Sequence, residues 1–272
     1  MEEALSDQII KSSSSMFNTH VVFKYLDFDS GLKTLQNQNI IFSRPDRFND
    51  PFDCRVELLE VDLNMTRKHM AGAFARMLKN DYTKRFRLKR QLDKASDQQL
   101  EDLTRRSLSA EFAQRGVTCF STSFEEVLMW AHYCKNHTGI CIGFDLVKLY
   151  SFLRNYGHEI GYFPVDYVDS INKKSLYPVN AEAIMYMLKT KSDIWKYEKE
   201  VRIIGSKFTF DEKLMSFIKL PKEIFTHVYI GINVTPNKRD EVLSLAKEIN
   251  PNISVFKMIP DYTLLKLIST EI

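Results

Sequence analysis

Short runs of β-branched and aromatic residues, separated by polar and helix-like stretches, are the feature that most constrains how this 272-residue chain folds. Such runs are typical of strands. The stretches between them do not alternate with the runs as parallel βαβ units require. We therefore expect an α+β fold with mixed, mainly antiparallel sheets and short helices. The predicted strands are residues 21–25, 40–43, 116–121, 138–145, 162–168, 200–204, 225–231, 253–259 and 264–268.

The helix-like stretches predict short helices and one long helical insertion. One helix begins at Ser30, and others are expected at 125–134, 181–191 and 237–249. Ser123 and Glu126 form a capping-box pattern at the start of the second. Between 63 and 114, charged residues, Leu, Met and Ala dominate, with one Gly and no Pro. This insertion is expected to hold two or three helices, with a polar gap near 93–99. We expect a lead-in at 1–19 and one domain over 20–272 that contains the insertion.

Composition narrows the class of protein. The chain is 44% hydrophobic and 27% charged, which suits a globular protein. It has no apolar run of about 18 residues, so no membrane span is expected. The four cysteines form no CxxC pair, which favours reduced thiols in a cytoplasmic protein, and their spacing favours no metal site. The net charge of +3 says little about partners, and the oligomeric state is left open.

A polar loop that contains two phenylalanines follows the second predicted strand, in residues 43–53. A loop that only connects two elements needs turn formers rather than bulky aromatic residues among charges. Phe48 and Phe52 are therefore expected to pin the loop to a core and hold its polar groups in place, as in many binding sites. An ordered turn whose aspartates cap a helix is an equally weighted alternative. The candidate binding residues here are Ser43, Arg44, Phe48, Asn49 and Asp50.

Two further clusters carry groups that could contact a ligand. Lys24 and Tyr25 end the first predicted strand and can donate hydrogen bonds to a phosphate or a ribose. An ordinary strand end with a solvated lysine is the more common arrangement. The second cluster lies around the helix at 125–134, where a histidine could act as a base but is more often structural. Its members are Ser121, Trp130, His132 and Tyr133.

A late segment combines two carboxylates, a guanidinium and two aromatic rings. If residues 198–204 are extended, Glu198, Glu200 and Arg202 lie on one face. They could form a solvated ladder of ion pairs. They could also form a site in which Arg202 orients one carboxylate while the other acts on a sugar hydroxyl. The neighbouring rings that could contact a flat ligand are Trp195 and Tyr197.

A basic cluster lies inside the helical insertion, in Lys84-Arg85-Phe86-Arg87-Leu88-Lys89-Arg90. Such clusters can bind phosphates or nucleic acid. More often they form a solvated helix face, which is the interpretation favoured here.

In their order along the chain, these clusters resemble the bacterial and phage domain-of-unknown-function family 2971. The resemblance extends over most of residues 20–270, but the helical insertion is not part of the family signature. The family name implies no activity. The motifs that carry it are Lys24-Tyr25, Phe42-Ser43-Arg44-Pro45, Phe48-Asn49-Asp50-Pro51-Phe52-Asp53, Cys119-Phe120-Ser121, Met129-Trp130-Ala131-His132-Tyr133, Gly139-Ile140-Cys141-Ile142-Gly143-Phe144 and Trp195-Lys196-Tyr197-Glu198-Lys199-Glu200-Val201-Arg202.

A second resemblance suggests an activity. The order of a polar and aromatic first strand, a short helix, a strand with a serine and a late strand with a glutamate is similar to ADP-ribosyltransferases, above all the branch that includes DNA-modifying toxins. This implies an ADP-ribosyltransferase-like core, NAD as the substrate, and a role as a toxin or anti-phage defence effector. Lys24 or Tyr25 would take the first-strand role, Ser43 the second-strand role, and Glu200 or Glu198 the catalytic role. The family's first-strand His or Arg is absent, because His20 precedes the strand.

The expected chemistry is cleavage of the nicotinamide–ribose bond through an oxocarbenium-like state, which a nearby carboxylate stabilises. Nicotinamide would stack on Tyr25, Phe48 or Trp130, and the diphosphate would need cations such as Lys24, Arg44 and Arg47. The acceptor could be a nucleic acid or a protein. Two alternatives stay open at this point. One is a non-catalytic module that binds a nucleotide or nucleic acid, and the other is a metal-dependent nuclease that uses Asp50, Asp53, Glu198 and Glu200.

Overall fold

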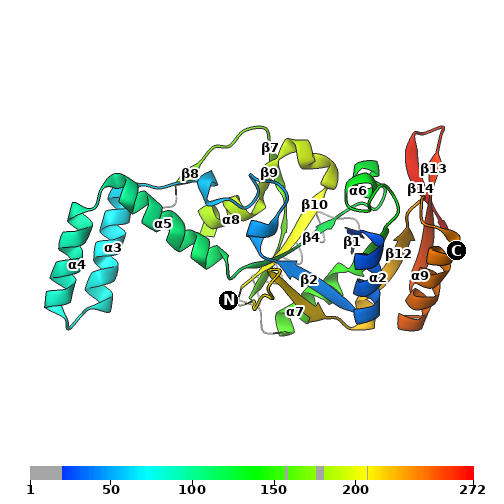
Figure 1. Cartoon of the computed structure of the whole chain (residues 1–272), viewed down its shortest axis with the longest axis horizontal. Coiled ribbons are helices and arrows are strands. Elements are labelled where there is room, and N and C mark those ends of the chain that lie inside the picture. The colour runs from blue at the N-terminus through cyan, green and yellow to red at the C-terminus, as the bar shows by residue number, and fades with distance from the viewer. Residues whose placement is uncertain (1–19, 157–158, 176–180, 207) are drawn as a thin grey trace. The chain divides into compact units, whose positions relative to one another are not determined.

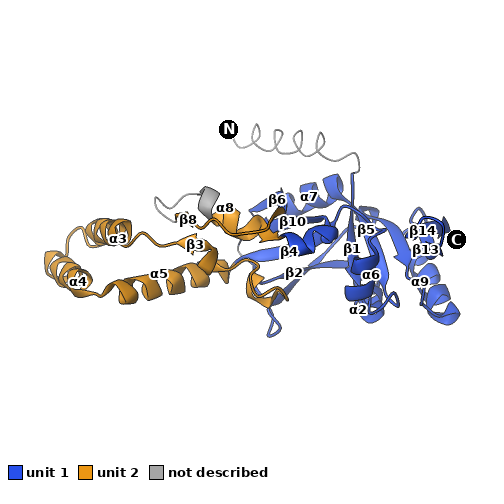
Figure 2. Cartoon of the chain, turned by 90° about the horizontal axis from the view of Figure 1, so that it is seen from above, with its two compact units in different colours: residues 1–44, 115–165, 193–272 blue, residues 45–114, 166–192 orange. Residues whose placement is uncertain are grey.

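The computed structural model describes residues 20–156, 159–175, 181–206 and 208–272 (Figure 1). The chain divides into two compact units (Figure 2). Unit 1 is made of residues 1–44, 115–165 and 193–272, and unit 2 of residues 45–114 and 166–192. The lead-in predicted at 1–19 lies outside the described residues. The fold is α+β with mainly antiparallel strand pairing, as the spacing of the β-rich runs predicts.

Unit 1 is built on a sheet to which ten of the described strands contribute. Its longest path runs β11-β2-β4-β1-β5-β12-β13-β14, and β10 joins β4 to β6 beside that path. All of these pairs are antiparallel except β12 with β13. The strands are β1 (Val21–Leu26), β2 (Asn39–Ser43), β4 (Gly116–Ser121), β5 (Ile140–Asp145), β6 (Ile160–Pro164), β10 (Glu200–Gly205), β11 (Met215–Lys219), β12 (Phe225–Ile230), β13 (Ser254–Asp261) and β14 (Lys266–Glu271).

Helices cover this sheet because their apolar residues recur with helical spacing. In α7 (Leu146–Asn155), Leu146, Leu149, Tyr150 and Leu153 are all buried, and the Asp145 side chain caps the first turn. No helix was expected there, although both signals are in the sequence. The other helices of unit 1 are α2 (Phe28–Asn37), α6 (Val127–His132), α9 (Pro236–Ile249), and the 3₁₀ turns η3 (Asp193–Glu198) and η4 (Lys222–Ile224).

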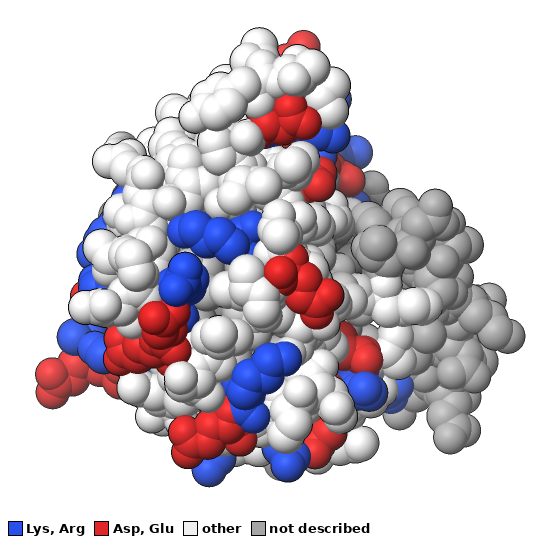
Figure 3. Space-filling view, turned by 90° about the vertical axis from the view of Figure 1, so that its right-hand side faces the viewer, with Lys and Arg blue, Asp and Glu red and all other residues white. Residues whose placement is uncertain are grey.

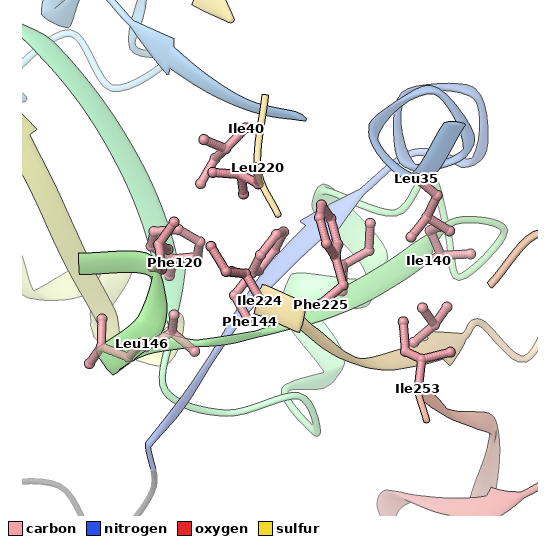
Figure 4. Close-up of a cluster of buried hydrophobic side chains, with 14 of the residues drawn as sticks. Leu35, Ile40, Phe120, Ile140, Phe144, Leu146, Leu220, Ile224, Phe225 and Ile253 are labelled. Atoms are coloured by element: carbon pink, nitrogen blue, oxygen red, sulfur yellow. The ribbon is translucent and has the colours of Figure 1, made fainter. Parts of the chain in front are cut away.

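The main core of unit 1 lies on the sheet face that includes Phe120, Phe144 and Val201. Figure 4 shows side chains from several strands and helices converging there, including Leu35 of α2 and Leu146 of α7. A close approach of α2 to β5 depends on Gly31. A Cβ at this position would lie 2.3 Å from a side-chain carbon of Ile140. Any larger residue at position 31 would therefore push α2 off the sheet.

A second, smaller core covers part of the opposite sheet face. Phe23, Tyr25, Trp130, Tyr229 and Met258 are buried together in it. Several of its rings are stacked, including those of Phe124 and Tyr229, whose centroids lie 4.1 Å apart. The sheet of unit 1 is thus packed on one face and on part of the other.

Unit 2 contains the helical insertion predicted at 63–114, which forms three helices. The break between the second and third helix falls at 95–96, inside the predicted polar gap. Aspartates cap the first two helices: Asp62 accepts from Met65 N, and Asp81 accepts from Lys84 N. The elements are η1 (Pro45–Arg47), η2 (Val56–Leu58), β3 (Leu59–Glu60), α3 (Leu63–Met77), α4 (Tyr82–Lys94), α5 (Asp97–Phe112), β7 (Asp166–Val168), β8 (Lys174–Ser175), α8 (Ala181–Lys189) and β9 (Thr190–Ser192).

Some predicted boundaries were wrong. The helix expected at 125–134 is α6, Val127–His132, and the Ser123 side chain bonds Glu125 N and Glu126 Oε1 in a turn before that helix instead of capping it. The run at 162–168 divides into β6 and β7, which belong to different units. The helix at 181–191 ends at Lys189, where β9 begins. The structure also contains β11, which was not predicted.

The surface of unit 1 around α9 and the β13–β14 hairpin carries both signs of charge. Figure 3 shows Lys and Arg side chains interspersed with Asp and Glu there. Within the described ranges, no helix combines the length and the apolar character needed to cross a bilayer.

Candidate functional site

Strand β4 is a branch point of the sheet in unit 1. One edge of β4 pairs with β10 over six residue pairs, from Glu200–Ser121 to Gly205–Gly116. Its other edge pairs with β1 at Phe23–Ser121 and with β2 at Ser43–Val117. Both β1 and β2 run antiparallel to β4, so if both continued along this edge of β4 they would occupy the same place. The two strands therefore diverge. We call this branch point the fork; it is formed by β1, β2 and residues 117–121 of β4.

The fork brings together strands that carry the predicted site residues. Partners in an antiparallel pair point to the same face, and so do residues two apart. Ser43 therefore shares a face with Val117, Ser121 and Glu200, and Tyr25 extends from β1 on that face. Lys24 extends to the opposite face, toward Phe120.

Lys24 nevertheless places its ammonium group inside the fork. Its Nζ donates to the Cys119 carbonyl at 2.9 Å and to Thr118 Oγ1 at 3.2 Å, and lies 5.3 Å from the centroid of the Phe120 ring. The ammonium thus bonds a β4 carbonyl near the point where the two neighbouring strands separate. Burial lowers the pKa of Lys24, and the negative charge of Glu200 acts in the opposite direction.

Glu200 and Arg202 form a buried, bidentate ion pair on β10. Arg202 Nε donates to Glu200 Oε1 at 2.7 Å, and Nη2 donates to Oε2 at 3.1 Å. The side chains are 4% and 0% exposed, so the solvated ladder considered from the sequence is excluded. A bidentate, charge-assisted pair of hydrogen bonds of this kind fixes the carboxylate in the plane of the guanidinium. Each carboxylate oxygen has two acceptor sites, so Arg202 does not exhaust the acceptor capacity of Glu200.

Cys119 is a further member of this cluster; it belongs to a motif of the family resemblance but was not predicted as a site residue. It lies opposite Arg202 in the β4–β10 pair. Burial raises the pKa of this thiol, and the Glu200 carboxylate raises it further. The thiol is therefore neutral rather than a thiolate nucleophile.

Glu198 lies next to this pair in the sequence but is not on the strand. It ends η3, and Lys199 has a left-handed backbone with φ of 47°, so β10 begins only at Glu200. The strand predicted at 200–204 is confirmed, but the condition that 198–204 is extended is not met at its first two residues. Glu198 is 3% exposed, and Oε1 accepts from Tyr133 Oη at 2.6 Å.

The aromatic residues predicted to hold a ring lie in two environments. Trp130 is fully buried, meets the Tyr25 ring edge-on at 5.3 Å, and donates from Nε1 to the Phe124 carbonyl at 2.7 Å. The Tyr25 hydroxyl bonds Ser123 O and Glu126 N, and burial raises its pKa. These two rings pack the second core and are not presented to solvent.

The remaining unit 1 candidates lie nearer to the surface or have backbone roles. His132 Nδ1 and Tyr197 Oη are 3.0 Å apart at an exposed position, and the rings of Tyr197 and Trp195 are tilted at 6.1 Å. Ser121 is buried, and its Oγ accepts from Ser123 N. Arg44 follows β2 and donates its backbone N–H to Leu214 O.

Phe48, Asn49 and Asp50 belong to unit 2. Asp50 is 2% exposed; its Oδ1 accepts from Phe52 N in a tight turn, and its carbonyl accepts from Asp53 N. This turn is the capping-type arrangement considered as the alternative for the loop, although no helix follows it. The Phe52 ring is 70% exposed, so the expectation that it anchors the loop was wrong.

A buried ion pair in unit 2 was also missed from the sequence. Lys191 Nζ lies 3.9 Å from Asp53 Oδ2, and both side chains are nearly inaccessible to solvent. The two residues are far apart in the chain, so no local pattern could join them. Across the described ranges, no group of three or more His, Cys, Asp or Glu side chains is arranged to hold a metal ion.

The fold and the fork define an α+β protein whose branched sheet carries a buried glutamate–arginine pair. Residues 129–203 match the family model described as "Protein of unknown function (DUF2971)". This segment includes α6, β5 and the Glu200–Arg202 pair. The matched range is narrower than the resemblance drawn from the motifs, because β1 and the loop at 43–53 lie before it. No curated protein and no solved structure matched the chain.

Proposed function

We propose that the chain is an ADP-ribosyltransferase-like enzyme that cleaves the nicotinamide–ribose bond of NAD and transfers ADP-ribose to an acceptor. The observation that carries this proposal is the fork. Strands β1, β2 and β10, which bear the three predicted roles, all pair with β4 within residues 116–121. The shared partner strand β4 puts the Ser43 hydroxyl and the Glu200 carboxylate on one sheet face, whereas Lys24 extends from the opposite face and bonds the Cys119 carbonyl of β4.

The carboxylate role suits Glu200. Cleavage of the nicotinamide–ribose bond develops positive charge on the ribose, and a fixed, ionised carboxylate stabilises that charge. Arg202 would act as a positioning residue, because its two hydrogen bonds hold the Glu200 carboxylate in one orientation. Ser43 lies on the same sheet face as Glu200 and would bond the ribose or the nicotinamide amide through its hydroxyl.

Lys24 would act as the first-strand residue that holds NAD. In the ADP-ribosyltransferases that the chain resembles, this residue is a histidine or an arginine. Its ammonium group supplies positive charge for the diphosphate at the fork. Tyr25 is the less suitable candidate, because its hydroxyl already bonds Ser123 O and Glu126 N in the core. Such an enzyme would act in the cytoplasm as a toxin or a defence effector, on a nucleic acid or a protein.

The proposal is tested by incubating the purified chain with NAD, alone and with DNA, RNA or cell lysate, and measuring free nicotinamide by chromatography. Nicotinamide release is expected from the wild type under at least one condition. Ser43→Ala should lower the rate about tenfold or more, as the loss of a substrate hydrogen bond does. A matched control is Ser269→Ala, a partly buried serine on β14 at the far end of the strand order.

Glu200→Gln should abolish release, but it also leaves Arg202 without its full counter-charge in a buried site. Its melting temperature must therefore be measured beside its activity. A Ser43→Ala protein that melts like the wild type and still releases nicotinamide at the wild-type rate would overturn the assignment of the fork. No release and no NAD-induced rise in melting temperature under any condition would overturn the activity.

A further inference from the structure

Helices α3, α4 and α5 of unit 2 enclose an apolar groove of about 500 Å³ that has no part in the proposed chemistry. Helix α3 contributes Met70 and Phe74, one turn apart, and α4 contributes Leu88 and Leu92 with the same spacing. Helix α5 closes the groove with Leu100, Leu103 and Arg106. Each helix therefore presents residues three or four positions apart, which is the pattern that lines a groove for another helix.

The groove is graded from a buried floor to an open edge. Leu100 and Leu92 are 1% and 7% exposed, whereas Leu103 is 48% exposed at the edge. Arg67 of α3 holds the walls together: it donates to the Leu92 and Ala95 carbonyls at 2.7 and 2.8 Å and pairs with Asp97 at 3.1 Å. The groove is thus preformed, which lowers the entropy lost when a partner binds.

Positive charge surrounds this apolar surface. Residues 63–114 contain twelve Lys and Arg against six Asp and Glu, although the whole chain has a net charge of only +3. On α4, Lys84 and Arg85 lie one turn before Leu88 and so continue the helix face that lines the groove. Arg106 lies in the lining itself, as does Asp102 one turn before it on α5, so the excess of positive charge comes from the surrounding residues. An occupant with acidic residues beside an apolar stripe would match this surface.

We propose that this groove is a docking site for an acidic amphipathic helix of a partner protein. A nucleic acid would use the cations but would leave Met70, Phe74 and Leu103 without contacts, because phosphate recognition needs no apolar groove. A helix with apolar residues at every third or fourth position fills the groove, and its acidic flanks meet Lys84, Arg85 and Arg106. The site lies in unit 2 and does not depend on the activity proposed for the fork.

The test is a selection from a displayed library of sixteen-residue helical peptides, with the full chain as bait. The library is randomised at positions on both faces of the peptide helix. Selected peptides are expected to carry apolar residues three and four apart and a net negative charge. Binding is then measured by fluorescence anisotropy with a labelled selected peptide. Leu103→Glu should weaken this binding tenfold or more, and Arg106→Glu should weaken it and reduce its dependence on salt.

Matched controls are available in the same helices. Phe86 is 70% exposed on α4 but does not line the groove, so Phe86→Glu should bind the peptide like the wild type. Arg90→Glu makes the charge change of Arg106→Glu outside the lining. The proposal is overturned if the selection yields no binder, or only peptides without acidic residues. It is also overturned if Leu103→Glu and Phe86→Glu bind equally well, or if a single-stranded oligonucleotide competes fully for the peptide site.

Discussion

In unit 1 the charged side chains of the candidate site are buried and paired, as Glu200 and Arg202 are, whereas on α4 of unit 2 the lysines and arginines stand mostly in solvent. Both regions combine basic and aromatic residues in the sequence, so composition does not separate them. The difference teaches that the surroundings of a charge, rather than its presence, decide what it can do. A buried pair fixes geometry for chemistry, and a solvated cluster attracts partners.

The largest effect that sharpens this comparison is expected from Arg202→Met. It leaves the Glu200 carboxylate buried without its counter-charge, and breaking such a pair costs about 3–5 kcal/mol of unfolding free energy. Urea denaturation of the variant and the wild type measures this cost.

The control for Arg202→Met is the double variant that also carries Glu200→Gln. It removes both charges, so it should recover most of the lost stability while remaining without activity. If the single variant is as stable as the double variant, the pair is not buried as described.

A smaller effect is expected from Tyr133→Phe, which removes the donor to the Glu198 carboxylate in unit 1. A hydrogen bond to a charged group contributes about 1.5–3 kcal/mol. The matched change Tyr197→Phe removes an exposed bond to His132 and should cost less than about 1 kcal/mol. Thermal unfolding of both variants decides this, and equal losses would contradict the account of the buried site.

A weaker, pH-dependent effect is expected at His227, on β12. Its pKa is lowered by burial, against the opposing charge of Glu271; it bonds Thr226 Oγ1 and stacks near Tyr229 and Phe256. The folded state therefore binds a proton more weakly than the unfolded state. The neutral His227 side chain therefore contributes fully to the free energy of unfolding above about pH 6.5. This contribution is lost as the pH falls through the lowered pKa of His227 in the folded state. Melting temperatures measured from pH 7.5 to 5 should thus fall less steeply in His227→Phe. Parallel curves would refute this.

The smallest effects on stability are expected on α4. Arg87→Ala and Arg90→Ala alter exposed cations, and each should change the unfolding free energy by less than about 0.5 kcal/mol. Chemical denaturation of each variant measures this. A loss of unfolding free energy as large as that of Arg202→Met would contradict the difference drawn between the buried pair in unit 1 and the solvated cations of α4.

Much of the fold could be predicted from the sequence because its signals are local. The strand ending in Lys24-Tyr25 and the three helices of the insertion follow from residue type and period. Strand β11 was missed although Phe217 and Ile218 favour strands, because that signal covers only two residues; Met215–Lys219 is extended through its pairing with β2. The start of β10 at Glu200 was predicted correctly, but nothing local in the sequence marks Lys199 as left-handed, so the separation of Glu198 from the strand could not be foreseen.

The sequence predicted which residues belong to the site better than it predicted their contacts with one another. The Glu200–Arg202 pair follows from the period of two, which any extended segment shows. The contact of Lys24 with Cys119 and the pairing of Asp53 with Lys191 depend on how distant segments meet, which no local pattern reveals. Trp130 was expected to face a ligand. Its burial follows from the small helix α6, which packs its ring against Tyr25.

The measurement that tests the central claim most directly is amide hydrogen exchange of the full chain with and without NAD, read by mass spectrometry. The account predicts slower exchange with NAD in peptides that cover residues 24–26, 43–44 and 118–123, and little change in α3, α4 and α5. Protection confined to those helices, or no protection at saturating NAD, would contradict the claim that the fork is the site.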